Sequence, residues 1–277
     1  MRYFDAHNHL HDERLHADAE ELLRECCAQG LYTAVVNGSC EGDWGDVLAL
    51  AKRSAVVIPS FGYHPWYVNE RSTTWSDVLV QMLRATPSAV GEIGLDRWKT
   101  EFDPAVQEEV FMTQVEIAQQ ENLPMSIHGL RAWGRLYDLL RSTRIPSCGF
   151  LLHSYGGPRE MIPQFAKLGA YFSCPGFFLN PGREMKLALF QHVPPDRLLL
   201  ETDAPDQPLP DALDRYRLPI GPNGRRVNHP ANITAVYEGF AKSQGVDPQA
   251  LATQIERNFR ALFGALVREH PEGPQPA

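Results

Sequence analysis

Short apolar segments alternate with longer amphipathic segments along almost the whole of this chain. Eight of the short segments have the composition of β-strands, at residues 3–6, 32–37, 56–62, 88–93, 124–127, 149–152, 170–174 and 198–202. Helical patterns lie at residues 17–29, 41–54, 75–86, 104–121, 131–142, 158–168, 183–192, 231–244 and 248–264. This alternation is typical of repeated β–α units around a parallel sheet. Eight such units predict an α/β protein with the (β/α)8 fold, a TIM barrel.

The length of the chain favours one barrel over two small domains, since 277 residues is close to the roughly 250 that this fold needs. The apolar runs at residues 33–36 and 198–200 are nearly continuous, which suits strands covered on both faces. We expect a single barrel domain over residues 1–265 and a C-terminal tail over residues 266–277. Residues 206–230 are rich in Pro, Gly, Asp and Arg, so they predict a long loop after the eighth strand.

Composition limits the compartment and the partners. The sequence has no apolar run of membrane-spanning length and no apolar signal core after Met1, so we expect a cytoplasmic protein that does not enter a membrane. Five cysteines without C-x-x-C spacing argue against a disulfide framework and a zinc knuckle. A net charge of −8 argues against extensive wrapping of nucleic acid, which needs many basic contacts to phosphate. A nucleic-acid substrate would therefore be held locally. The oligomeric state stays open.

Side chains that can bind metal follow the predicted strands at their C-terminal ends. His7 and His9 follow the first strand, and two residues that are two apart in an extended chain point to the same face. The fourth, fifth, sixth and eighth strands end in Glu92, His128, His153 and Asp203. Active sites of barrel enzymes are built at this rim. Because burying so many polar groups without partners is costly, the set predicts a metal site.

The number of these side chains predicts a pair of divalent ions. Four histidines and two carboxylates exceed what one tetrahedral ion needs, and Glu92 is the expected bridge between two ions. We expect Asp203 to orient the attacking water or accept its proton, so Asp203 and Glu92 are the predicted catalytic residues. Histidine-rich coordination suits zinc, manganese or nickel, whereas magnesium prefers oxygen ligands, so the identity of the ions stays open.

The sequence resembles the TatD family of metal-dependent deoxyribonucleases in an ordered series of motifs. They are D-x-H-x-H at residues 5–9, G-x-H-P at 62–65, G-E-I-G-L-D at 91–96, H-S-x-x-G at 153–157 and E-T-D-x-P at 201–205. The resemblance covers almost the whole chain. It implies a hydrolase, in particular an exonuclease, that cleaves phosphodiester bonds of DNA or a small phosphodiester. The ligands that it implies are the six that the strand ends select: His7, His9, Glu92, His128, His153 and Asp203.

Two further residues are candidates for binding the substrate phosphate. His64 ends the third strand, and its alternative role is structural packing with Pro65 and Trp66. Arg131 follows the fifth strand, where members of the family commonly have H-x-R. Here His128 is followed by two residues before Arg131, so the arginine lies one position later. This departure leaves the predicted metal ligands in place and moves the residue expected to contact the substrate.

Three other polar residues have expected roles outside the ligand set. Glu201 is expected to hydrogen-bond a ligand histidine, which would hold that ring in place. His11 is expected in a loop or outside the inner ligands, because the first strand should be turning there. His229 belongs to no cluster and is expected at the surface.

Three alternative functions stay open at this point. An amidohydrolase acting on a small amide, lactone or cyclic imide would use nearly the same ligands, but such enzymes often use a carboxylated lysine where the fourth strand offers Glu92. A phosphoesterase of the polymerase-and-histidinol-phosphatase type shares D-x-H-x-H but not E-T-D-x-P. A non-catalytic metal-binding barrel would require an incomplete site, whereas all six ligands are present. DNA, RNA and a small molecule are all possible substrates.

Overall fold

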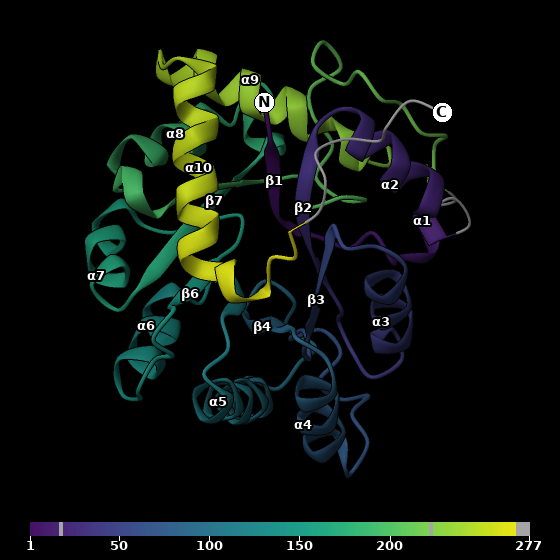
Figure 1. Cartoon of the computed structure of the whole chain (residues 1–277). Helices are drawn as coiled ribbons and strands as arrows, with labels where there is room; N and C mark the ends of the chain where they lie inside the picture. Colours follow the sequence, from purple (N-terminus) through teal and green to yellow (C-terminus); the bar gives the residue numbers. More distant parts are fainter. Residues whose placement is uncertain (17–18, 222–223, 270–277) are drawn as a thin grey trace.

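Eight parallel strands form one sheet in the order of the chain, from β1 to β8 (Figure 1). The structure is a computed structural model, and it describes residues 1–16, 19–221 and 224–269. The strands are β1 (Tyr3–Asn8), β2 (Leu31–Asn37), β3 (Val57–Phe61), β4 (Ala89–Asp96), β5 (Met125–Leu130), β6 (Phe150–Leu152), β7 (Ala170–Pro175) and β8 (Leu198–Glu201). Each of the eight predicted strands is present.

The sheet closes where β1 meets the end of β8. The backbone N–H of Asp203 donates to the carbonyl of His7 at 3.0 Å. The buried carboxylate of Asp5 accepts from the backbone N–H of Thr202 at 3.0 Å and from its hydroxyl at 2.6 Å. These bonds join the two ends of the strand order, so the predicted (β/α)8 barrel is confirmed.

Helices surround the sheet and cover its outer face (Figure 1). The longer ones are α2 (Ala19–Ala28), α3 (Trp44–Arg53), α4 (Trp75–Ala85), α5 (Pro104–Glu121), α6 (Trp133–Arg141), α7 (Ile162–Lys167), α8 (Glu184–Ala188), α9 (Ile233–Gln244) and α10 (Pro248–Phe263). All nine overlap predicted helices. The short α1 (Glu13–His16) and the 3₁₀ turns η2 (Gly176–Leu179) and η4 (Pro195–Arg197) were not predicted, because three or four residues are too few to show a helical period.

Helix α5 buries two glutamines that hold the strand ends beside the candidate site. Gln107 accepts from the backbone N–H of Asp96 at 3.1 Å and donates to the carbonyl of Pro65 at 3.2 Å. Gln114 accepts from the backbone N–H of Tyr63 at 2.6 Å and donates to its carbonyl at 3.2 Å. Both side chains are fully buried. They satisfy backbone groups that the sheet leaves unpaired where β3 and β4 end.

The segment after β8 is the long loop that the sequence predicts, apart from residues 222–223, which lie outside the described residues. Its described part forms one isolated antiparallel bridge, between Arg217 and Asn228. Asn228 also donates to the carbonyl of Thr202 at 2.9 Å. The guanidinium of Arg14 binds both Asp12 and Asp206 at 2.8 Å. The two ends of the loop are therefore fastened to the barrel next to the strand ends of β1 and β8.

The last described residues lie against the barrel. Glu269 accepts from the hydroxyl of Tyr32 at 2.6 Å and binds Arg260 at 2.9 Å. Arg268 donates to the carbonyl of Val57 at 2.7 Å. Residues 270–277 of the predicted tail lie outside the described residues, so the boundary at residue 265 stays a prediction. Among the described helices, none is both long enough and apolar enough to cross a membrane.

Candidate metal centre

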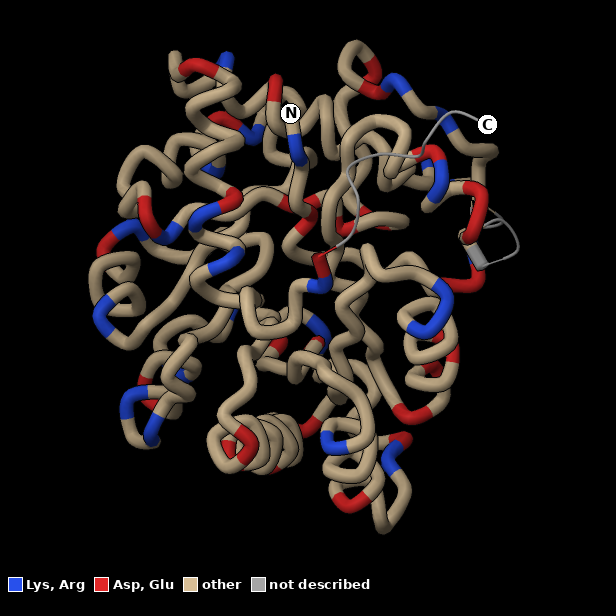
Figure 2. The backbone as a smooth tube through the Cα atoms, viewed as in Figure 1, with Lys and Arg blue, Asp and Glu red and all other residues tan. Residues whose placement is uncertain are grey.

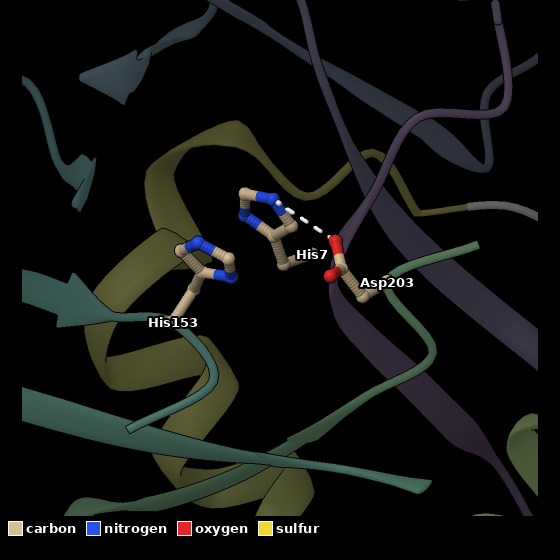
Figure 3. A group of neighbouring side chains, drawn as sticks. All are labelled: His7, His153 and Asp203. Carbon is tan, nitrogen blue, oxygen red and sulfur yellow. Dashed lines mark ion pairs between the residues drawn. The ribbon is translucent and has the colours of Figure 1, made fainter. Parts of the chain in front are cut away.

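All six predicted ligands lie together at the C-terminal ends of the strands. They are His7 and His9 from β1 and the residue after it, Glu92 from β4, His128 from β5, His153 after β6 and Asp203 after β8. Figure 3 shows three of them: His7 lies between His153 and Asp203, and its ring stacks on that of His153 at a centroid distance of 3.9 Å. Strands far apart in the sequence thus bring their polar side chains to one place.

The two carboxylate oxygens of Glu92 face two different pairs of histidine nitrogens. Oε2 lies 3.2 Å from His9 Nε2 and 3.4 Å from His7 Nε2. Oε1 lies 2.8 Å from His153 Nε2 and 3.0 Å from His128 Nδ1. The carboxylate is almost completely buried. This is the arrangement expected of a carboxylate that bridges two cations, each with its own pair of imidazoles.

Asp203 joins the side of the cluster that His7 and His9 form. Its Oδ1 lies 3.6 Å from His7 Nε2 and 3.7 Å from His9 Nε2, and Figure 3 marks the first of these contacts. Its Oδ2 accepts a hydrogen bond from the side-chain amide of Gln207. One oxygen thus faces the histidines while the other is held by the loop after β8.

Two of the histidines have their second ring nitrogen engaged by an acceptor. His9 Nδ1 lies 2.7 Å from the carbonyl of Asn37, and His128 Nε2 lies 3.1 Å from Asp96 Oδ2. Each acceptor requires a proton on that nitrogen, so the other nitrogen presents a lone pair toward Glu92. A lone pair is what a metal ligand needs. These two imidazoles therefore fit divalent cations, and the ligand atoms of His7, His9 and Glu92 lie close enough together to hold one.

His64 has the opposite arrangement, although its Nε2 lies 3.5 Å from Glu92 Oε1. Its Nδ1 accepts from the backbone N–H of Trp66 at 3.2 Å, so the neutral ring has its proton on Nε2. Burial lowers the pKa of His64 well below its usual value, which keeps the ring neutral. His64 therefore presents an N–H donor rather than a lone pair to the site, and this suits contact with an anionic group.

Arg131, the other predicted substrate contact, lies at the same rim directly after β5. Its side chain is exposed, and its backbone has a φ of 55°. Among the residues that the structure describes, none forms a hydrogen bond or an ion pair with its side chain. The guanidinium is therefore available to an anion, but the structure does not place it among the ligand side chains.

Asp96 is a residue of the site to which the sequence analysis gave no role. Its Oδ2 accepts from His128 and, at 2.8 Å, from Trp66 Nε1, and its Oδ1 accepts from the backbone N–H of Trp98 at 2.7 Å. Burial opposes ionisation, but the contacts with His128 dominate and lower the pKa of Asp96 to about 2. Alternation along β4 could have identified it, because Glu92 and Asp96 are four apart and share a face.

The hydrogen bond expected between Glu201 and a ligand histidine is not present. Glu201 Oε1 lies 3.6 Å from His153 Nδ1, which is beyond hydrogen-bond distance. The carboxylate instead accepts from the backbone N–H of Ser154 at 2.8 Å, from its hydroxyl at 2.6 Å, and from the hydroxyl of Ser173. That expectation was wrong because the serines are nearer acceptor partners, so Glu201 acts on His153 only through its charge.

Burial and charge move the pKa values of the two predicted catalytic carboxylates in opposite directions. Burial opposes ionisation of Glu92, but the surrounding histidines, with His153 first, hold its pKa well below the usual value. Burial is the main cause that raises the pKa of Asp203 to about 7; the charges of His153 and His9 oppose this rise, and those of Glu201 and Glu92 add to it.

The backbone is constrained where the site residues leave their strands. Gly94 has a φ of 150°, and a Cβ atom there would lie 2.1 Å from the carbonyl oxygen of His128. Only glycine permits this close approach of β4 to β5. Ser154 and Asp203 have φ values of 46° and 53°, which cost energy for residues other than glycine. Such conformations concentrate at functional sites.

The predicted position is confirmed for one of two histidines outside the centre and is wrong for the other. His11 is buried, and its Nε2 lies 3.3 Å from Asp43 Oδ2, outside the inner ligands as expected. His229 was expected at the surface, and this was wrong: it is 3 % exposed and its Nε2 lies 2.9 Å from Glu25 Oε2. The long loop returns across α2 at this point, which the local sequence does not reveal.

Comparison with known proteins agrees with this geometry. The sequence model of the family described as TatD related DNase matches residues 4–264. The chain belongs to this family. A relative from Citrobacter koseri, named a 3'-5' ssDNA/RNA exonuclease TatD, is 28% identical over 94% of this chain and 98% of its own length. The YcfH protein of Escherichia coli strain K12, named an uncharacterized metal-dependent hydrolase, is also 28% identical, over 95% of this chain and 96% of its own.

Solved structures agree with the family assignment. The crystal structure of YJJV, a TatD homologue from Escherichia coli K12, superposes with a TM-score of 0.85 at 25% identity, over 95% of this chain and 98% of that one. A TatD family hydrolase from Entamoeba histolytica superposes with a TM-score of 0.83 at 19% identity, over 95% and 98% of the two chains. The second similarity concerns the fold alone.

Proposed function

We propose that this protein is a divalent-metal-dependent nuclease that hydrolyses phosphodiester bonds of DNA, acting at the ends of single strands. The observation that supports this most is the position of Glu92, whose two oxygens face separate pairs of histidine nitrogens at 2.8 to 3.4 Å. A histidine-rich pair of sites sharing a carboxylate is suited to an anionic ester. Membership of a family described as related to deoxyribonucleases supports the same substrate class.

In this proposal the six ligands divide into two groups. His7, His9 and Asp203 would hold one ion, His128 and His153 would hold the other, and Glu92 would be shared. Ions bound there would neutralise phosphate charge and lower the pKa of a coordinated water. The imidazole content favours zinc, manganese or nickel over magnesium at these positions.

Asp203 is the proposed acceptor of the water proton. In the reaction, the water oxygen forms a bond to phosphorus as the water proton passes to Asp203. The bond from phosphorus to the leaving ester oxygen breaks, and that oxygen departs as an alcohol after taking the proton from Asp203. Asp203 Oδ1 faces the histidines, where the water would stand, while Gln207 holds Oδ2. A carboxylate held at one oxygen keeps the other oriented toward the proton.

His64 and Arg131 are the proposed contacts to the substrate phosphate. His64 directs an N–H donor into the site beside Glu92 Oε1, and the donor remains neutral because the ring is buried. Arg131 offers a full positive charge at the edge of the same rim. A donor inside the site and a cation outside it would position an anionic ester without neutralising Glu92.

The test is an assay of purified protein reconstituted with zinc, manganese, nickel or magnesium. The substrates are single-stranded DNA, a simple phosphodiester, a phosphomonoester and a small cyclic amide. We expect hydrolysis of both diesters and loss of it in His153→Gln, whereas the exposed His192→Gln serves as the matched control and keeps the wild-type rate. Turnover of the cyclic amide or the monoester without turnover of either diester would contradict the proposal.

A further inference from the structure

Trp98 is the one tryptophan of the five that is largely exposed to solvent. Its side chain is 52 % exposed, whereas Trp44, Trp75 and Trp133 are at most 9 % exposed and Trp66 is half-buried. Indole is a large apolar surface, and a single exposed apolar residue needs no explanation by itself. Trp98 is of interest because of its position relative to the candidate metal centre.

The backbone of Trp98 is two hydrogen bonds away from a candidate metal ligand. Its N–H donates to Asp96 Oδ1 at 2.7 Å, and Asp96 Oδ2 accepts from His128 Nε2 at 3.1 Å. Trp98 is the second residue after the end of β4, at the rim where the candidate ligands lie. The backbone that carries this exposed indole is thereby held to the carboxylate that contacts His128.

Two cations lie near Trp98. The ammonium of Lys99 lies 3.6 Å from the ring centroid of Trp66, and that ring contacts His64 at 5.0 Å. Arg131 follows the residue whose carbonyl accepts the backbone N–H of Arg97 at 2.8 Å. Within the described parts of the chain, neither Lys99 nor Arg131 forms an ion pair with a carboxylate. No carboxylate of the described residues neutralises either charge, so both can bind phosphate.

Arg97 differs from Lys99 and Arg131, because its charge is paired with that of Glu108. Its guanidinium binds Glu108 at 2.8 Å and Gln107 at 2.7 Å, which ties the start of this loop to α5. The residue before Trp98 is thus anchored, while Trp98 itself projects to solvent. An anchored backbone with an exposed indole is preorganised, so little conformational freedom is lost when a flat ligand stacks on it.

We propose that Trp98 is a stacking platform for a base of single-stranded nucleic acid, and that Lys99 and Arg131 bind the flanking phosphates. The inference rests on the proposed function, since it names how that site recognises its substrate. Base–aromatic stacking tolerates any base because every base has a π-face. In a chain with a net charge of −8, affinity must come from such local contacts.

The experiment measures binding of two fluorescein-labelled phosphorothioate strands of equal length to the metal-reconstituted protein by fluorescence anisotropy. One strand is oligothymidylate, and the other has abasic residues in place of every nucleoside. The quantity compared is the Kd of the abasic strand divided by the Kd of oligothymidylate. We expect this ratio to fall by about 5- to 160-fold in Trp98→Ala and to stay near the wild-type value in Trp98→Phe. The matched control is Val246→Ala, an exposed apolar residue after α9 that should keep the wild-type ratio.

Partial unfolding or metal loss would weaken the binding of both strands by the same factor. The ratio of the two Kd values within one variant is therefore unaffected by either. A wild-type ratio in Trp98→Ala would overturn the inference, and so would an equal loss of affinity for both strands. The proposed function fails by a different result, namely that the wild-type protein does not hydrolyse the ordinary phosphodiester form of the same oligonucleotide.

Discussion

The carboxylate of Asp96 determines which nitrogen of His128 faces Glu92. Because Asp96 accepts from Nε2, the lone pair of Nδ1 is directed to the centre. We expect Asp96→Asn to weaken metal binding by about 10- to 100-fold, because the amide no longer favours one ring orientation. Competition with a chromophoric chelator measures the affinity, and far-UV circular dichroism confirms that the barrel is folded.

The matched control for this variant is Asp103→Asn. Asp103 is exposed and caps α5 by accepting from the backbone N–H of Ala105 at 2.8 Å, a task that asparagine performs equally well. Its metal affinity should equal that of the wild type. An unchanged affinity in Asp96→Asn would mean that Trp66 and the packing around His128 fix the ring without the carboxylate.

Substitution of Asp203 should lower the rate of hydrolysis more than it lowers metal binding. Asp203→Asn keeps the shape of the side chain and removes its charge, while five other candidate ligands remain. We expect kcat for diester hydrolysis to fall by about 10²- to 10⁴-fold, the usual contribution of a general base. Single-turnover rate and metal content are measured on one preparation at saturating metal.

Two outcomes would contradict this assignment. A rate near that of the wild type would show that a group other than Asp203 accepts the proton of the water. Loss of an ion together with the rate would show that the fall in kcat comes from loss of the metal and not from loss of the proton acceptor.

The clustering of the six candidate ligands could be predicted because it follows from two local rules. Alternation places His7 and His9 on one face, and parallel strands bring their C-terminal ends to one rim. The partners of the ligands could not be predicted in the same way. Whether Glu201 bonds to His153 or to Ser154 depends on differences of less than 1 Å in side-chain position. No sequence pattern reports such differences.

At the scale of elements, α9 helps to close the barrel through Tyr237. Its buried hydroxyl donates to the carbonyl of Phe4 at 3.0 Å and accepts from the backbone N–H of the same residue at 3.1 Å. We expect Tyr237→Phe to lower the free energy of unfolding by about 1–3 kcal/mol, because two buried backbone groups lose their partner. Urea denaturation at fixed metal concentration measures the loss.

The control for this variant is Tyr171→Phe. Tyr171 is 5 % exposed, but its hydroxyl forms no hydrogen bond with any residue that the structure describes. Removing that hydroxyl should change the free energy of unfolding by much less. Equal effects of the two substitutions would show that the Tyr237 hydroxyl adds nothing specific where β1 meets α9.

The regular elements could be predicted because each is long enough to show its own period. Helix α5 spans Pro104–Glu121, as predicted, since Asp103 and Pro104 mark its start and Asn122, with a φ of 51°, ends it. The burial of His229 could not be predicted, because it depends on the path of the long loop across α2. Local sequence has no information about that path.

At the scale of the whole molecule, charge is dispersed rather than gathered. Figure 2 shows Lys and Arg interspersed with Asp and Glu along the helices on the face in view, with no continuous basic stretch there. Single-stranded nucleic acid should therefore contact few cations. If Lys99 and Arg131 are the phosphate contacts, a plot of log Kd against log salt concentration should have a slope of about 1.4.

Titration of oligonucleotide binding with potassium chloride gives that slope. A slope of about 4 or more would contradict this prediction, because it would indicate several phosphate contacts by Lys or Arg residues other than Lys99 and Arg131. Lys99→Gln should lower the slope by about 0.7, because one counterion fewer is released.

The central claim is that two divalent ions share Glu92 and act together on a phosphodiester. The measurement that tests it most directly is a titration of metal-free protein with manganese or zinc, following bound metal and single-turnover hydrolysis of a DNA strand in the same samples. We expect the rate to rise with the second equivalent and to reach its plateau at two ions per chain, and Glu92→Gln to bind fewer ions and lose the rate. Full activity at one ion per chain, or in Glu92→Gln, would contradict the claim.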